Sequence, residues 1–252
     1  MSYELPGGMS ISPEMMMSLM ANMQRVLESG VPLEKYLGKR EHVAGKYLEV
    51  LASTSPDTVE GVRGIINVTL EMRETMVMSD RMEAVRCFYA SRNMGKVLLD
   101  KCKVLPSPVH GNGVFATRDI AVNEVITLYP CDIVTEVVSK GIKYHIPLGH
   151  PFFKSKTDCE RYSYFDRGLM TLALVGDPLQ TDNPTFLGHM CNDKSKCGSE
   201  LDTRSYLLNS HSSNASFTLF DKEFVAIVAK RSISNGEEIF VTYGVDYWLR
   251  NK

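Results

Sequence analysis

Apolar residues recur at helical spacing through the first part of the chain and predict an N-terminal helical domain over residues 1–96. Ser12 and Pro13 suit the first turn of a helix, and Gly30 suits its end. Further apolar stripes indicate three more helices after this first one. These three helices are expected at residues 33–51, 55–76 and 80–94.

From residue 97 onward, short runs of β-branched and aromatic residues alternate with turn residues, which is typical of short strands. Asn123-Glu124 is expected to join two strands, and Asp221-Lys222 to form a hairpin turn. The predicted fold class is therefore α+β, with the helical domain followed by a β-rich domain over residues 97–252. The predicted strands cover residues 97–105, 114–117, 125–129, 216–220, 224–229 and 238–243.

Methionine is frequent in the predicted helices, and this residue fills irregular gaps in cores and also lines adaptable binding surfaces. A helical bundle with these side chains in its core is the favoured interpretation. The alternative is a partner surface, through which the chain would form a homodimer. The methionines in question are Met15, Met16, Met17, Met20, Met23, Met72, Met76, Met78, Met82 and Met94.

Composition and charge limit the class of protein. A hydrophobic content of 44% and a charged content of 23% are near the globular average, which argues against overall disorder. The net charge of -2 gives no reason to expect direct nucleic-acid binding. The N-terminus lacks the features of a secretory signal, and no apolar run reaches the length of about 20 residues that a membrane helix needs. Six scattered cysteines are expected to be reduced, in a soluble intracellular protein with no membrane partner.

Three motifs carry the candidate chemistry. In the first, Gly111-Asn112-Gly113, two glycines let backbone amides approach a ligand closely. It is not a Rossmann fingerprint, because no third glycine and no following helix are present. The second motif is Gly188-His189-x-x-Asn192-Asp193, followed later by Asn214. The third runs from Gly236-Glu237-Glu238 through Tyr243-Gly244 to Trp248.

In this order and spacing the motifs resemble those of the SET-domain protein-lysine methyltransferases, and the closing motif is similar to that of a small chlorella-virus member. The resemblance implies a β-rich fold of short strands whose C-terminal segment closes the site in a pseudoknot-like arrangement. It implies S-adenosyl-L-methionine as cofactor and, as partner, a protein that carries the target lysine. A histone or another basic protein would be that partner, which would make the chain a chromatin regulator. The compartment would be the nucleus or cytoplasm, including those of a virus-infected host cell.

The resemblance also implies roles for individual residues. Tyr243 would orient the lysine amine and steer the methyl group, and Tyr162 and Tyr247 would line the channel beside it. Phe217 and Val241 stand at channel positions where a phenolic hydroxyl would limit methylation. Since neither residue carries one, we expect the enzyme to go beyond monomethylation. The residues expected at the cofactor are Gly111, Asn112, Gly113, Gly188, His189, Asn214, Tyr243 and Trp248.

Two departures from the family pattern keep an alternative open. Gly188 stands where the family usually has asparagine, and a long insertion separates His189 from Asn214. These departures favour a catalytically inactive SET-like module that binds other proteins. A zinc site is a further alternative, because His189, Cys191, Cys197 and His211 are all of ligand type. Their spacing matches no tight finger pattern, so no metal is expected.

Overall fold

The computed structural model describes residues 3–5, 9–11, 56–74, 85, 89, 98–139, 141–166, 169–170, 172–195, 199, 202–210, 212–220 and 222–250. The chain forms two compact units. The first comprises Met1–Thr54 and Gly64–Val85, and the second comprises Ser55–Arg63 and Arg86–Lys252. The predicted helices at residues 13–30 and 33–51 lie outside the described residues. The predicted domain boundary at residue 96 stays a prediction.

The described part of the first unit contains two short strands and most of one helix. Strands β1 (Tyr3–Leu5) and β2 (Met9–Ile11) pair in antiparallel fashion. Helix α3 (Val59–Glu74) confirms the helix predicted from residue 55, and its first turn belongs to the second unit. The hydroxyl of Thr58 accepts a hydrogen bond from the amide of Gly61 at 3.0 Å and so caps this helix. Of the helix predicted at residues 80–94, only positions 85 and 89 are described, and both are helical.

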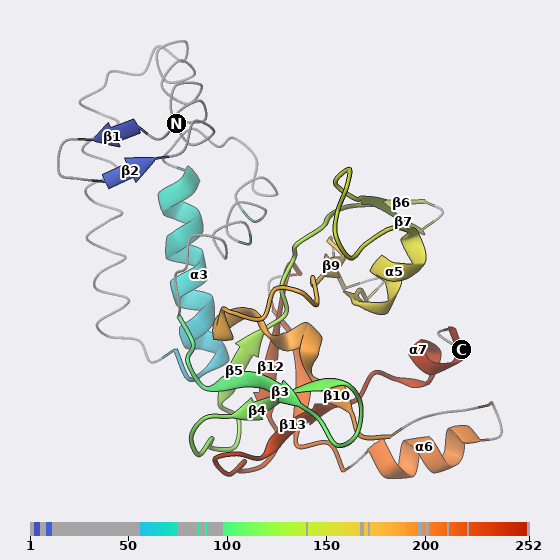
Figure 1. The fold of residues 1–252 in the computed structure, drawn as a ribbon. Coiled ribbons are helices and arrows are strands. Elements are labelled where there is room, and N and C mark those ends of the chain that lie inside the picture. The colour runs from blue at the N-terminus through green and yellow to red at the C-terminus, as the bar shows by residue number, and fades with distance from the viewer. Residues whose placement is uncertain are drawn as a thin grey trace. The chain divides into compact units, whose positions relative to one another are not determined.

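The second unit is built on two small sheets, shown in Figure 1. The four-stranded sheet has the order β10-β13-β4-β3, in which β13 runs parallel to β10 and antiparallel to β4. The three-stranded sheet has the order β11-β12-β5 and is antiparallel throughout. The strands are β3 (Cys102–Pro106), β4 (Asn112–Ala116), β5 (Val125–Leu128), β10 (Asn192–Asp193), β11 (Ala215–Phe220), β12 (Phe224–Ala229) and β13 (Glu238–Val241).

The predicted strands and turns are confirmed with local corrections. The first strand begins only at Cys102, so the prediction of strand from residue 97 was wrong for its first residues. Lys222 adopts a φ of 64° in the turn between β11 and β12, as the hairpin prediction requires. Asn123, with a φ of 66°, turns the chain between β4 and β5, but these two strands belong to different sheets.

Short elements fill the remainder of the second unit, and most of them were not predicted. Helix α5 begins with a capping box between Ser155 and Asp158, a signal that is present in the sequence. Helices α6 and α7 contact each other. The elements are two hairpins, β6 (Val134–Val138) with β7 (Gly141–His145) and β8 (Ser163–Tyr164) with β9 (Leu174–Val175), the helices α5 (Lys156–Arg161), α6 (Thr203–Ser210) and α7 (Val245–Arg250), and the 3-10 turns η2 (Pro184–Phe186) and η3 (Gly188–Met190).

One apolar core joins the strands that carry the predicted motifs. It contains buried side chains from β4, β5, β12 and β13, such as Val114, Ile126, Ile227 and Ile239. Each of these four side chains is completely buried. The β-rich half of the predicted fold class is therefore confirmed, and among the described helices none is long and apolar enough to span a bilayer.

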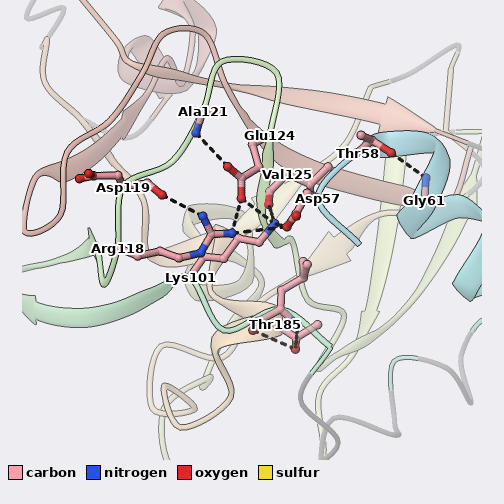
Figure 2. A network of polar contacts seen from close by, with 11 residues as sticks. Asp57, Thr58, Gly61, Lys101, Arg118, Asp119, Ala121, Glu124, Val125 and Thr185 are labelled. Atoms are coloured by element: carbon pink, nitrogen blue, oxygen red, sulfur yellow. Dashed lines mark hydrogen bonds and ion pairs between the residues drawn. The ribbon is translucent and has the colours of Figure 1, made fainter. Parts of the chain in front are cut away.

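A buried lysine ties the segment before α3 to the start of β5, as Figure 2 shows. Lys101 is 4% exposed, and its ammonium group pairs with Asp57 and, at 3.1 Å, with Glu124. It also donates to the carbonyl of Val125 at 2.6 Å, while the amide of Val125 donates to the carbonyl of Asp57 at 2.6 Å. The guanidinium of Arg118 pairs with both carboxylates from the solvent side. The segment around Asp57 is therefore part of the β-rich unit.

We expect Lys101→Met to lower the free energy of unfolding by about 2 kcal/mol, because the buried cation and its hydrogen bonds are lost while Arg118 still pairs with both carboxylates. The side chain of Glu124 is 9% exposed and would bear most of this cost. Lys143→Met is the matched control, since Lys143 pairs with Glu136 at an exposed site and should contribute less than about 1 kcal/mol. Chemical denaturation of both variants measures the difference, and equal losses would contradict the prediction.

Candidate active site

The Gly-Asn-Gly turn is held by two buried polar side chains from the neighbouring strands. The Asn192 side-chain amide donates to the carbonyls of His110 at 3.0 Å and Asn112 at 3.1 Å, and to the Glu238 carboxylate at 3.0 Å. A Cβ atom at Gly113 would overlap the Glu238 carboxylate and approach the Asn192 amide nitrogen to 2.9 Å. Gly113 is therefore required by close packing, and the turn is fixed from one side.

Gly111 needs to be glycine for a different reason. Its φ is +52°, which a side chain disfavours, and no atom lies within 4 Å of the place a Cβ would occupy. The second oxygen of Glu238 accepts from the hydroxyl of Ser107 at 2.9 Å and so fixes the strand that leads into the turn. One glycine of the motif thus faces open space while the other is closely packed.

Asn214 attaches the start of β11 to the closing strand β13. It is completely buried, and its amide donates to the Glu238 carbonyl at 2.8 Å while its oxygen accepts from the amide of Phe240 at 2.7 Å. The amide also donates to the Glu237 carboxylate at 3.1 Å. The Arg231 guanidinium, 2.5 Å away, is the main cause that lowers the pKa of Glu237 to about 2. The Asn214 side chain thereby pairs with the backbone of β13 much as a neighbouring strand would.

His189 is buried against the backbone of a neighbouring loop. Its Nε2 lies 2.9 Å from the carbonyl oxygen of Asp177, which can only accept, so Nε2 is the donor and carries a proton. A Cβ atom at Gly176 would overlap the imidazole, so that glycine makes room for the ring. The preceding residue, Gly188, is equally constrained, because a Cβ there would lie 3.0 Å from backbone atoms of Leu128 and Tyr129.

Tyr243 lies at the centre of an aromatic cluster that follows β13. Its hydroxyl donates to the Cys191 carbonyl at 2.8 Å. Its ring lies 4.6 Å from that of Tyr247 and stacks on that of Trp248 with 5.8 Å between centroids. Burial, followed by the neighbouring Tyr247 and Cys191, raises the pKa of Tyr243 well above its usual value. The phenol therefore stays neutral near pH 7 and acts as a hydrogen-bond donor.

Tyr162 lies at the end of α5, in a second aromatic group. Its ring contacts those of Phe152 at 5.3 Å and Phe153 at 6.4 Å, and its carbonyl accepts from the hydroxyl of Tyr129 at 2.8 Å. Tyr247 reaches this region as well, since its hydroxyl lies 3.5 Å from the carbonyl of Arg161. Burial raises the pKa of both Tyr162 and Tyr247, so both phenols are also neutral near pH 7.

A pocket of about 290 Å³ opens beside this aromatic region. Phe217 lines it together with Tyr164, whose ring lies 4.8 Å away, and Lys230 donates to the Ser213 hydroxyl at 2.9 Å on its rim. Val241, the other predicted channel residue, is fully buried in the apolar core and does not line the pocket. The complete lining is Tyr164, Ser213, Ala215, Ser216, Phe217, Lys230 and Thr242.

Several residues that hold the site together were not among the predicted site residues. Asn192 and Asp193 follow the Gly188-His189 pair after two intervening residues, and both are 4% exposed. The sequence did contain a signal for them, the adjacent Asn and Asp within a glycine motif, because such side chains often form specific hydrogen bonds to the nearby backbone. Glu238 was recognised only as part of the closing motif, with no role of its own. Tyr206 gave no signal, since it lies within the insertion.

Metal binding finds no support among the described residues, where no three His, Cys, Asp or Glu side chains are grouped to hold an ion. Cys197 and His211, two of the four residues weighed as zinc ligands, lie outside the described residues. Cys191 is buried, and its burial raises the pKa of its thiol well above the usual value. The thiol form, rather than the thiolate that binds metal, is therefore favoured at this position.

Comparison with known families agrees with this geometry. The SET domain model matches residues 111–244, which is more than half of the chain. The chain belongs to the SET domain family, as its motifs predicted, and this family consists generally of protein-lysine methyltransferases. The particular similarity to a chlorella-virus member stays a prediction. No curated protein shows a significant match to the chain.

The solved structures that are similar to the chain include the following three, each at low sequence identity. A Plasmodium falciparum histone methyltransferase candidate is 19% identical with a TM-score of 0.36, over 60% of this chain and 99% of that chain. The SET domain of ATXR5 in complex with dimethylated histone H3 is 17% identical with a TM-score of 0.36, over 68% and 70%. The methyltransferase domain of human PR domain-containing protein 2 is 16% identical with a TM-score of 0.31, over 57% and 77%.

Introducing the asparagine that the family usually carries, by Gly188→Asn, should destabilise the protein by about 2 kcal/mol. The new Cβ would lie 3.0 Å from backbone atoms of Leu128 and Tyr129, which cannot rotate away as a side chain would. Gly149→Asn is the matched control, because Gly149 faces open space with a φ of +76°, which asparagine tolerates. Thermal or chemical denaturation compares the two variants. A Gly188→Asn protein as stable as the control would show that the loop adapts.

Proposed function

We propose that the chain is an S-adenosyl-L-methionine-dependent protein-lysine N-methyltransferase. The observation that carries the proposal is the position of Tyr243. It follows β13, the strand that pairs with the motif strands β4 and β10, and its hydroxyl donates to the Cys191 carbonyl. The Gly111–Gly113 turn is connected to this strand through Asn192 and Glu238. These connections between the motifs support a single site, as the proposed activity requires.

The residues around Gly111 and Trp248 suit an adenosyl cofactor. The turn is rigid on the Gly113 side and open on the Gly111 side, so a ligand can approach its backbone closely. The Trp248 ring, already stacked on Tyr243, offers an aromatic face of the kind on which a nucleobase stacks. Bound there, the cofactor would supply a methyl group on a sulfonium, an electrophile that needs no activation by acid. We propose Gly111, Asn112, Gly113, Gly188, His189, Asn214, Tyr243 and Trp248 as the binding residues.

The chain's own residues would align the reaction and control its protons. Transfer forms a bond from the lysine nitrogen to the methyl carbon while the bond from carbon to sulfur breaks, and a proton leaves the amine to solvent. The amine must be neutral to react, and desolvation beside aromatic rings lowers the pKa of a lysine. Tyr243, being neutral, would orient the amine through its hydroxyl, with Tyr162 and Tyr247 excluding water around it.

We propose further that the enzyme adds more than one methyl group. Phe217 lines the pocket and has no hydroxyl with which to retain a water molecule beside the amine. Val241 also lacks a hydroxyl, although its side chain lies in the core. Mass spectra of the modified lysine should show products heavier than the monomethyl form. Phe217→Tyr should shift these products toward monomethylation, and spectra with only monomethyl product in the wild type would refute this part of the proposal.

The proposed substrate is a histone or another basic protein, because family members act on protein lysines. Acidic side chains near Tyr162, including Asp158 and Glu160, would attract such a partner. For residues 1–96 we propose a role in substrate recognition, dimerisation or regulation. Nuclear or cytoplasmic location follows from the same substrate class, and nuclear location would favour a histone.

A second candidate function is an inactive SET-like module that binds proteins, favoured by Gly188 and by the long insertion before Asn214. Label transfer from S-adenosyl-L-methionine to histones and to a cell lysate tests the two against each other, with calorimetric titration of the cofactor alongside. Label on a protein lysine supports the enzyme. Cofactor binding without transfer means that the substrate was missing from the mixture. The absence of both transfer and binding would refute the enzyme and favour the inactive module.

A further inference from the structure

The Asp193 carboxylate connects three segments that are far apart in the sequence. It is 4% exposed and lies at the end of β10. Its Oδ2 accepts hydrogen bonds from the Tyr206 hydroxyl at 2.6 Å, the Tyr243 amide at 2.9 Å and the Trp248 indole nitrogen at 3.1 Å. Its Oδ1 accepts from the amide of Ser195 at 2.9 Å. Two of these donors belong to the segment that contains the proposed catalytic tyrosine.

Tyr206 extends this network by one more hydrogen bond. It lies on α6, within the insertion between the two halves of the second motif, and is 1% exposed. While its hydroxyl donates to Asp193, the same oxygen accepts from the amide of Gly244 at 2.9 Å. The amides of Tyr243 and Gly244 are thus both held by Asp193, one directly and one through Tyr206.

A carboxylate suits this position for a physical reason. A buried charge is costly unless hydrogen bonds satisfy it, and the four donors on Asp193 do so. Hydrogen bonds to an ionised acceptor are about twice as strong as neutral ones. An asparagine in its place would present either a weaker acceptor or an amide whose hydrogens face other donors. The closing segment is therefore held most firmly when residue 193 is a carboxylate.

We propose that Asp193 is a positioning residue, which together with Tyr206 holds the segment from Tyr243 to Trp248 in place. The insertion before Asn214 thereby completes the site, because it supplies Tyr206, and its length is no sign of lost activity. The catalytic consequence rests on the proposed methyltransferase function. The conformational consequence does not, because it concerns the environment of Trp248.

The experiment compares Asp193→Asn and Tyr206→Phe with the wild-type protein. Trp248 is the single tryptophan of the chain, so tryptophan emission, excited selectively over the tyrosines, reports on this segment. Both variants should show red-shifted emission and stronger acrylamide quenching, the aspartate variant more so. With an active preparation, kcat should fall about 100-fold in Asp193→Asn, as expected for a displaced catalytic group, and about 10-fold in Tyr206→Phe. The KM for the protein substrate should change less than about threefold, because neither residue is proposed to contact it.

Tyr89→Phe is the matched control. Its buried hydroxyl donates to the Glu223 carbonyl at 2.8 Å, so its loss should lower stability like that of Tyr206 without altering Trp248 fluorescence or kcat. If Asp193→Asn does not fold, Tyr206→Phe carries the test. Unchanged emission and quenching in the folded variants would overturn the proposal. Altered fluorescence in the variants, together with no methyl transfer by the wild-type protein, would retain the positioning role and refute only the proposed activity.

Discussion

Tyr243→Phe is expected to reduce methyl transfer by about 100- to 1,000-fold while leaving the protein folded. The lost hydroxyl, whose proton is held by the Cys191 carbonyl, is proposed to orient the lysine amine through its oxygen, and removing one well-placed hydrogen-bonding group from an active site typically costs this much. The ring itself would stay packed against Tyr247 and Trp248, so cofactor affinity should change little. Initial rates with labelled cofactor measure the first effect, and calorimetry with S-adenosylhomocysteine measures the second.

The control for this prediction is Tyr247→Phe. The Tyr247 hydroxyl makes a long hydrogen bond of 3.5 Å to the Arg161 carbonyl, so its removal should cost less than about tenfold. A Tyr243→Phe protein that retains a tenth of the wild-type rate would mean that the phenol is not essential. Loss of cofactor binding in that variant would instead indicate a structural role for the hydroxyl.

Truncation after Asn235 should abolish folding as well as activity. It removes β13, the strand that pairs with both β4 and β10 and places Ile239 and Val241 in the core with no exposed surface. Without it the remaining strands would expose a large apolar surface to water. Circular dichroism and the yield of soluble protein measure the outcome.

Truncation after Gly244 is the informative comparison, because it retains β13 and Tyr243 and removes only α7 and the residues after it. We expect this shorter protein to keep most of its β structure and to lose activity, since Tyr247 and Trp248 are absent. A folded and active protein ending at Asn235 would contradict the first prediction. Failure of both proteins to fold would assign α7 a larger share of the stability than its contacts indicate.

Local patterns in the sequence were sufficient for the strands but not for their pairing. Strands β11 and β12 were predicted because their apolar runs flank a two-residue turn, and neighbouring strands of this kind pair with each other. The placement of β13 pairs it with β4, more than a hundred positions earlier, and with β10, 48 positions earlier, which no local pattern specifies. Helix α6 was missed because it is short and has little apolar periodicity.

The same distinction applies to the site. Gly113 and Asn214 were predicted from the resemblance, yet the reasons for them became clear only from contacts with Glu238. The contact between Tyr206 and Asp193 depends on how the insertion folds, so no motif could indicate it. Val241 was assigned to the channel by the family resemblance, and this role stays a prediction. Alternation along a strand turns such a residue toward the core just as readily.

The ion pairs of Lys101 have a consequence for the evolution of this chain. Because Asp57 belongs to the β-rich unit and residues 64–85 do not, the β-rich unit is discontinuous in the sequence, interrupted by part of the other unit. Recombination at a single point cannot transplant such a unit as one cassette. A gene fusion that begins near residue 97 would leave Asp57 behind and separate it from Lys101. The two units are therefore expected to have been inherited together and to have diverged as one piece.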